Sequence, residues 1–165
     1  MAVTVGLLVA AAGAVGAMRA ATRLDRLHVR TDAAWVALDA ALCRRARAVT
    51  ALNGSLTLCC AADAVLRAGG NLARAEVENE LGRLLAVLDR RGLEPAYSGR
   101  LADAEQRVVI ARQVYNDAVR DTLALRSRRT VRWLRLAGTA AAPRYFDIAE
   151  VAPPSYGPEW EGAGA

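Results

Sequence analysis

At 165 residues the chain has room for one domain with a buried core, and its 5% aromatic content and many helix formers favour an all-α fold. Its basic residues are all arginine, and the net positive charge is concentrated at the ends of the predicted domain. Residues 19–30 carry a net charge of +3 and residues 126–144 carry +6, while residues 31–125 are neutral and residues 145–165 carry −4. Because a nucleic-acid-binding domain would spread basic charge over its body, this distribution argues against nucleic acid as a partner.

The chain begins with an apolar stretch, residues 1–18, that contains no charged side chain. A helix needs about 20 apolar residues to cross a bilayer, with about 17 as the lower limit, so this stretch is predicted to be a transmembrane anchor. Arg19, Arg23, Arg26 and Arg30 follow at once. Because basic residues stay on the cytoplasmic side, we expect a single-pass protein of the cell membrane with its N-terminus outside and the remaining domain in the cytoplasm.

A cleaved signal peptide is the alternative interpretation, because Val15-Gly16-Ala17 resembles a small-residue cleavage site. Signal peptides carry their basic residues before the apolar stretch, whereas here these residues follow it, and this order favours an uncleaved anchor. Met18 would also serve as an internal start, which would give a form of the protein without the anchor.

Residues 28–66 place mostly apolar side chains at alternating steps of three and four, which predicts an amphipathic helix. Asn53-Gly54-Ser55 interrupts the composition but not this register, so we expect one long kinked helix; a turn between two helices is the alternative. A continuous helix of this length would outreach its neighbours. The stripe around Trp35 and Leu38 would then lack a partner within the chain, which suggests self-association.

Three further segments complete the predicted bundle. Gly69-Gly70 is typical of a helix end, and Asn71 is expected to cap a second helix that runs to about Arg91. Residues 92–99 include a proline and predict a loop, and a third helix should follow to about Arg126. Short loops between long amphipathic helices indicate antiparallel packing.

A short fourth helix is expected around residues 131–136, and the prolines and glycines beyond Gly138 predict a disordered tail. The predicted fold is therefore all-α: an N-terminal transmembrane helix, then an antiparallel bundle of three long helices plus a short fourth. The predicted divisions are a transmembrane anchor at 1–18, the bundle at 19–137 and a Pro/Gly-rich acidic tail at 138–165.

Several blocks of the sequence, in the right order, resemble the helices of the LemA family, and the run from Tyr115 to Val119 is the strongest match. In chain order the blocks are Asp32–Asp39, Arg44–Ala46, Glu78–Val87, Asp103–Val108, Ala111–Asp121 and Tyr145–Asp147. The resemblance implies a membrane helix followed by an α-helical bundle, with no established catalytic residues and a structural or interaction role at a membrane. Arg47, Thr50 and Val114 depart from the family pattern, so the chain resembles a divergent member.

Tyr115-Asn116-Asp117 is a polar block in the middle of the third predicted helix, where asparagine is a poor helix former. We expect it to be a structural clamp, in which Asn116 hydrogen-bonds to Arg44 or Arg45 on the first helix of the bundle and fixes the register. A ligand-binding patch at the same residues is the alternative.

A cluster of arginines with one tryptophan follows that helix: Arg126, Arg128, Arg129, Arg132, Trp133 and Arg135. A basic amphipathic segment with tryptophan is suited to an anionic membrane surface or an acidic partner. The alternative is a helix end whose arginines only complement the helix dipole.

Candidate chemistry is sparse. His28 is the single histidine, there is no lysine, and Cys43, Cys59 and Cys60 have neither metal-ligand nor CxxC spacing. No phosphate loop, nucleophile elbow or nucleotide fingerprint occurs. We therefore expect no catalytic, cofactor or metal site, and predict a membrane-tethered scaffolding protein. The expected partners are the bilayer, an unidentified membrane-associated protein and a second copy of the chain. The alternative is a peripheral lipid-binding or membrane-shaping module that uses residues 126–135.

Overall fold

The computed structural model describes residues 1–52, 54–134 and 141–147, and within these ranges every regular element is a helix. The helices are α1 (Ala2–Thr50), α2 (Leu56–Arg67), α3 (Asn71–Ala86), α4 (Pro95–Arg126) and α5 (Arg129–Trp133). The predicted all-α bundle behind a long apolar N-terminal helix is confirmed.

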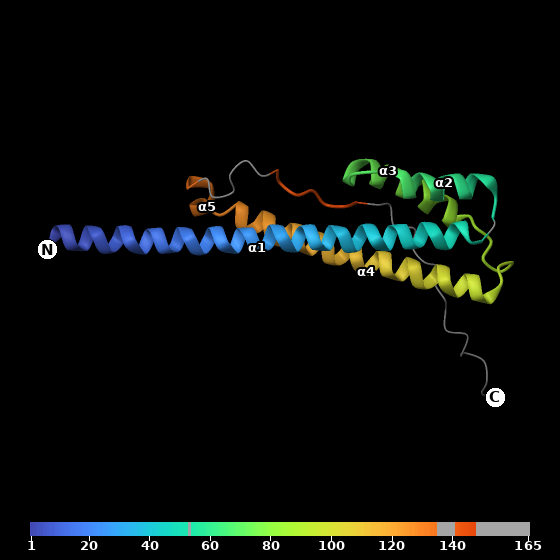
Figure 1. Ribbon diagram of the computed structural model, residues 1–165, viewed down its shortest axis with the longest axis horizontal. Coiled ribbons are helices and arrows are strands. Elements are labelled where there is room, and N and C mark those ends of the chain that lie inside the picture. The colour runs from blue at the N-terminus through green and yellow to red at the C-terminus, as the bar shows by residue number, and fades with distance from the viewer. Residues whose placement is uncertain (53, 135–140, 148–165) are drawn as a thin grey trace, which may run out of the picture.

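Helix α1 is one continuous rod of 49 residues, which corresponds to a length of about 74 Å at 1.5 Å per residue. Its first part extends beyond every other element, and its second part forms one wall of the bundle (Figure 1). The first fully buried side chain along the rod is Leu24. The helix therefore continues without a break past the predicted division after residue 18, and its side chains begin to pack against the bundle a few residues later.

Helix α4 runs antiparallel to the second part of α1 (Figure 1). Their contact forms the central core, which Phe146 closes: Ala34, Leu38, Ala41 and Leu42 from α1, and Val108, Tyr115, Ala118 and Val119 from α4. Leu38 is completely buried there. The expectation that the stripe around Trp35 and Leu38 lacks an intramolecular partner is therefore wrong, because the 32-residue α4 lies along it.

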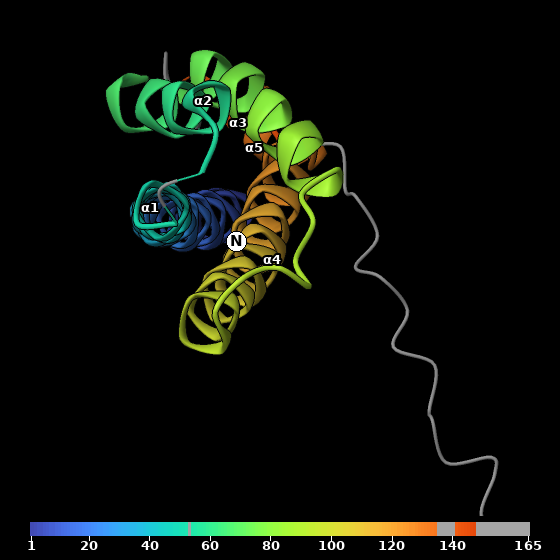
Figure 2. The same ribbon diagram turned by 90° about the vertical axis from the view of Figure 1, so that its right-hand side faces the viewer.

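The first helix of the bundle does not continue through residue 54. It ends at Thr50, and α2 begins at Leu56, so the predicted kink is wrong and the alternative turn is correct. Ser55 caps α2, because its hydroxyl oxygen accepts a hydrogen bond from the Leu58 N–H at 3.3 Å. The reversal returns α2 onto α1, and α2 and α3 lie together on one side of the α1–α4 pair (Figure 2).

This turn creates a second core at the far end of the bundle: Ala46, Val49, Leu58, Ala62, Val65, Leu81, Leu85 and Leu101. Gly70 precedes α3 at a φ of +80°, a conformation that glycine adopts without strain. Gly70 is the N-cap and Asn71 is the first helical residue, so the predicted cap at Asn71 is wrong. Helix α3 ends at Ala86, five residues before the expected Arg91. Helix α4 begins inside the predicted loop 92–99, because a proline is compatible with the first position of a helix.

Residues 141–147 form an extended strap across the bundle, and Phe146 of this strap is completely buried. This part of the predicted disordered tail therefore packs on the helices, while residues 138–140 and 148–165 lie outside the described residues. The short last helix begins at Arg129 rather than at Val131. Leu24, Leu125 and Val131 form a third small core that holds α5 against α1 and α4.

Candidate interaction surfaces

The polar block on α4 holds the strap. Both hydrogen-bonding groups of the Asn116 amide pair with the backbone of Phe146: Nδ2 donates to its carbonyl oxygen at 3.2 Å, and Oδ1 accepts from its N–H at 2.9 Å. The Tyr115 hydroxyl donates to the carbonyl oxygen of Arg144 at 2.8 Å. Two neighbouring residues of α4 thus bind the extended backbone at two residues of the strap, Arg144 and Phe146.

Aromatic side chains complete this contact. Trp35 of α1 lies with its ring centroid 5.5 Å from that of Tyr115 and 5.7 Å from that of Phe146, each at an interplanar angle of 60°. Tilted aromatic pairs at this separation are favourable beyond their buried area. The strap therefore closes the α1–α4 contact from one side as part of the core.

The partners predicted for the clamp are wrong. Asn116 binds the strap, whereas Arg45 forms a buried ion pair with Glu78 of α3. Arg44 is exposed on α1. Asp117 pairs with Arg120 of its own helix at 3.0 Å, near the surface. The structure brings Tyr115 and Asn116 together at one site, and it separates the other three predicted clamp residues from them.

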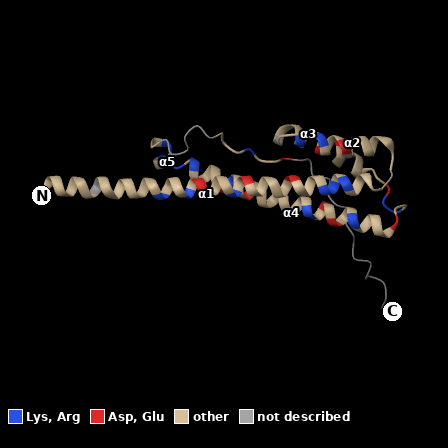
Figure 3. Cartoon of the chain, in the orientation of Figure 1, with Lys and Arg blue, Asp and Glu red and all other residues tan. Residues whose placement is uncertain are grey.

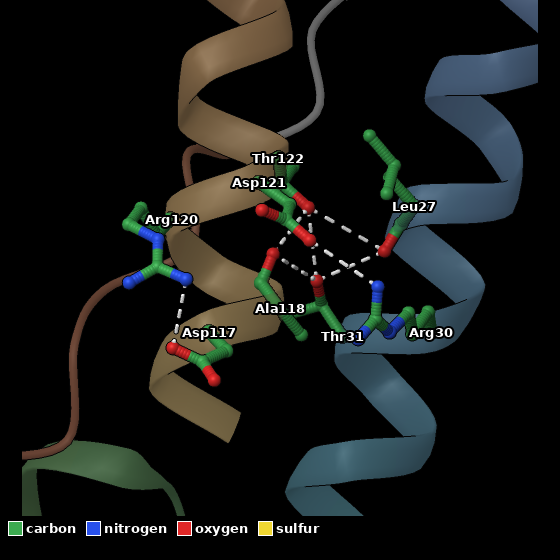
Figure 4. Close-up of polar contacts among 8 residues, drawn as sticks. All are labelled: Leu27, Arg30, Thr31, Asp117, Ala118, Arg120, Asp121 and Thr122. Carbon is green, nitrogen blue, oxygen red and sulfur yellow. Dashed lines mark hydrogen bonds and ion pairs between the residues drawn. The ribbon is translucent and has the colours of Figure 1, made fainter. Parts of the chain in front are cut away.

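The polar pair that links α1 to α4 consists of two threonines that the sequence analysis did not single out (Figure 4). The Thr31 and Thr122 hydroxyl oxygens are 3.0 Å apart and buried, so one hydroxyl donates to the other, and the accepting hydroxyl is left to donate to a carbonyl of its own helix at 2.9 Å. Arg30 and Asp121 form a more exposed ion pair beside them at 3.2 Å. Thr31 stands within the apolar stripe of its helix, and that position is the signal that could have identified it.

Charged side chains connect α3 to α1. Glu78 binds Arg45, and Arg74 binds Asp39 at 2.5 Å and the carbonyl oxygen of Val65. Burial raises the pKa of Glu78 above its usual value, although the Arg45 guanidinium opposes the shift. Among the described residues, Arg45 Nε, Arg74 Nε and Glu78 Oε1 are buried without a hydrogen-bond partner. The four side chains of this network, Asp39, Arg45, Arg74 and Glu78, line neither of the two hollows described below, so we interpret the network as a structural connection.

An open hollow lies beside the strap, between α1 and the α2–α3 turn. His28, Asp32 and Trp35 line one side of it, and residues 141–144 line another. His28 Nε2 lies 3.4 Å from Nη1 of Arg126. No group of three or more metal-ligating side chains occurs among the described residues, and the three cysteines are free thiols.

A shallow apolar groove lies on the other side of the α1–α4 contact. It is lined by Ala37, Ala40, Ala41, Arg44, Arg107, Ile110, Ala111 and Val114. Ile110 and Val114 in this lining are 52% and 47% exposed. Large apolar side chains that gather on a surface are typical of a protein-binding site.

The end of the bundle next to the apolar part of α1 carries arginines from two distant segments (Figure 3). Together we call these residues the collar: Arg19, Arg23 and Arg26 of α1, and Arg126, Arg128, Arg129 and Arg132 at the end of α4 and on α5. The predicted basic surface thus includes α1 as well. Trp133 is 86% exposed beside the collar, and Arg135 of the predicted surface lies outside the described residues.

Comparisons with known proteins returned no matching family model, no matching curated protein and no matching solved structure. The resemblance to the LemA family therefore stays a prediction, which depends on the residue blocks quoted above and on their order along the chain.

Proposed function

We propose that this chain is a membrane-tethered helical bundle that presents a protein-binding surface close to the bilayer, as a non-enzymatic scaffold. The observation that carries the proposal is the single rod α1, whose first part is apolar and exposed and whose second part forms the core of the bundle. By length and composition, α1 is long and apolar enough to cross a membrane, and the apolar window is unburied.

Water is an unfavourable surrounding for the exposed part of α1. Val3, Leu7 and Leu8 are more than 70% exposed, and they belong to a stretch of 18 residues without a charge. A contiguous apolar surface of this kind is rare on soluble monomers and suits a lipid environment. The arginines that follow favour the cell membrane as location, with the N-terminus outside and the bundle in the cytoplasm. The blocks that resemble the LemA family support the same topology.

The groove between α1 and α4 supports the scaffolding part of the proposal. Its exposed side chains come from two helices that a long core holds in register, so the surface is fixed before a partner arrives. A preformed apolar surface loses little conformational entropy when it binds. We infer that a membrane-associated protein docks there, whereas the thin set of titratable groups gives no support to a catalytic role.

The tether is tested by extracting membranes with alkaline carbonate. We expect the full chain to stay in the pellet, and a chain that begins at Met18 to be released. The topology is tested with a membrane-impermeant thiol reagent on a chain whose only cysteine is Cys60, which is exposed on α2. Labelling should require permeabilised cells, whereas a control chain with its only cysteine at Ala2→Cys should react from outside. A full chain released by carbonate would contradict the tether.

A further inference from the structure

The collar is assembled by the fold. Its α1 arginines and its α4–α5 arginines are about 100 residues apart in the sequence. The small core of Leu24, Leu125 and Val131 brings the two groups together, with Ala20 and Leu27 packed against it. The two groups come to the same end of the molecule only in the folded chain.

Few acidic groups balance the collar. Asp25 is the only acidic residue between residues 19 and 30, and residues 126–134 contain none. The next arginine along α1, Arg30, is already paired with Asp121. The His28 imidazole lies beside Arg126, and this ring carries no negative charge that could balance the arginines. The guanidinium groups of Arg19, Arg23, Arg26, Arg128, Arg129 and Arg132 lie at one end of the molecule, where they repel one another and favour an external anion.

The place of the collar along α1 indicates which anion is available. The arginines begin one residue after the apolar stretch, at the level where a crossing helix leaves the hydrocarbon and meets the lipid phosphates. Trp133 and Leu134 on the same end are exposed. Tryptophan is enriched at this interface, because its ring is apolar and its N–H is polar. Arginines close to an anionic leaflet are attracted by its negative surface potential.

We propose that the collar binds the phosphates of anionic phospholipids in the leaflet that α1 crosses, with Trp133 inserted between the headgroups. This inference depends on the proposed tether and adds its ligand class and its orientation. Helix α5 lies against the leaflet, and the α2–α3 end of the bundle points away from it. The bundle is held at the membrane surface by two attachments instead of one.

The test uses the full chain reconstituted in vesicles that contain acyl-brominated lipid, which quenches tryptophan fluorescence near the hydrocarbon. One set of vesicles contains neutral phosphatidylcholine only, and the other also contains phosphatidylglycerol. The signal of Trp133 is the part of the quenching that disappears in Trp133→Phe. We expect this part to be larger in the anionic vesicles. Millimolar inorganic phosphate at constant ionic strength should not remove it, because the site takes a membrane surface and not a free ion.

The variant Arg128→Gln/Arg129→Gln/Arg132→Gln should lose the excess quenching in anionic vesicles. The matched control changes three exposed arginines at the far end of the bundle, Arg47, Arg91 and Arg100, to glutamine and should keep it. These substitutions lie on the surface, and circular dichroism verifies that both variants are folded.

The proposal is overturned if Trp133 quenching is equal in the two kinds of vesicle or unchanged in the collar variant. It is also overturned if inorganic phosphate removes the excess quenching of Trp133. The same holds if an acidic protein shields Trp133 while anionic lipid does not. These outcomes leave the tether untouched, because carbonate extraction measures it separately. A chain that carbonate releases would instead contradict the proposed function itself.

Discussion

Asn116 combines a donor and an acceptor in one short side chain, and this pair of groups matches the backbone of a single extended residue. Aspartate has the same shape but no donor, and alanine has neither group. The two hydrogen bonds to Phe146 compensate for an asparagine in the middle of a helix, where it would otherwise compete with the helix backbone. At this scale the identity of one residue determines whether the strap is held.

We expect Asn116→Ala to lower the free energy of unfolding by about 1–3 kcal/mol, because the Phe146 N–H and carbonyl would remain buried without partners. Asn116→Asp should also destabilise the protein, since it keeps the acceptor but places a negative charge against the Phe146 carbonyl. Thermal unfolding in mild detergent, followed by circular dichroism, measures both. The control is Gln113→Ala, an exposed position on the same helix. Equal melting temperatures for Asn116→Ala and Gln113→Ala would show that Asn116 does not stabilise the fold by holding the strap.

The sequence was informative about where the clamp lies and uninformative about what it holds. A polar block in mid-helix requires a partner, and that requirement identified Tyr115 and Asn116. Periodicity cannot tell which distant backbone approaches a side chain, so the strap 30 residues further on was not recognised as the partner. Thr31 and Thr122 were missed for the opposite reason: threonine in an apolar stripe disturbs the pattern too little to attract attention.

Among the elements, the helices themselves were predictable because their apolar stripes repeat at helical spacing. The reversal after Thr50 was not predictable in this way. Helix α2 packs back on α1, and its apolar positions continue the register of the α1 stripe, so the periodicity shows no break at the turn. Ser55 was the better signal, since a serine before an apolar run is typical of a helix start. In the sequence Pro95 indicates a loop, although in the structure it occupies the first turn of α4.

Helix α3 depends on buried charges as well as on apolar contacts. Removing one partner of such a pair leaves the other charge buried and uncompensated, which typically costs about 3–5 kcal/mol. Glu78→Ala would leave the Arg45 guanidinium buried without its partner, whereas Arg74 would keep its contacts with Asp39, Cys43 and Val65. The α2–α3 pair is therefore the part of the bundle that a single substitution loosens most.

The raised pKa of Glu78 gives this element a pH dependence. In the folded chain Glu78 holds its proton to a higher pH than in the unfolded chain, where its pKa is near the ordinary value of 4.5. The folded state therefore binds more protons, and the contribution of Glu78 to stability falls as the pH rises from about 4.5 through the folded pKa. Urea unfolding of the wild-type chain and of Glu78→Gln at several pH values should show the difference between them shrinking or reversing as pH rises. A difference that grows with pH would contradict the assignment.

For the molecule as a whole, α1 joins its exposed apolar part to the groove as one continuous helix. From residue 18 to Ala37, which lines the groove, the helix rises about 29 Å, so the groove would lie at a set height above the proposed bilayer surface. The collar, if it binds lipid, would prevent rotation about the rod. Tether, collar and groove would then present one apolar surface to partners that lie on or near the same membrane.

The groove is tested by placing a photo-crosslinking amino acid at Ala37, which lines it, and at Ala102, which is exposed elsewhere on the bundle. We expect a discrete adduct from position 37 and none from position 102. The adduct should disappear in Ile110→Glu, because a carboxylate in the middle of the groove would have to be buried by an apolar partner. An adduct of twice the chain's mass would identify a second copy as the occupant, and a different mass a separate protein. Equal adducts from both positions, or an adduct that survives Ile110→Glu, would show that the exposed apolar side chains of α1 and α4 are not a binding surface.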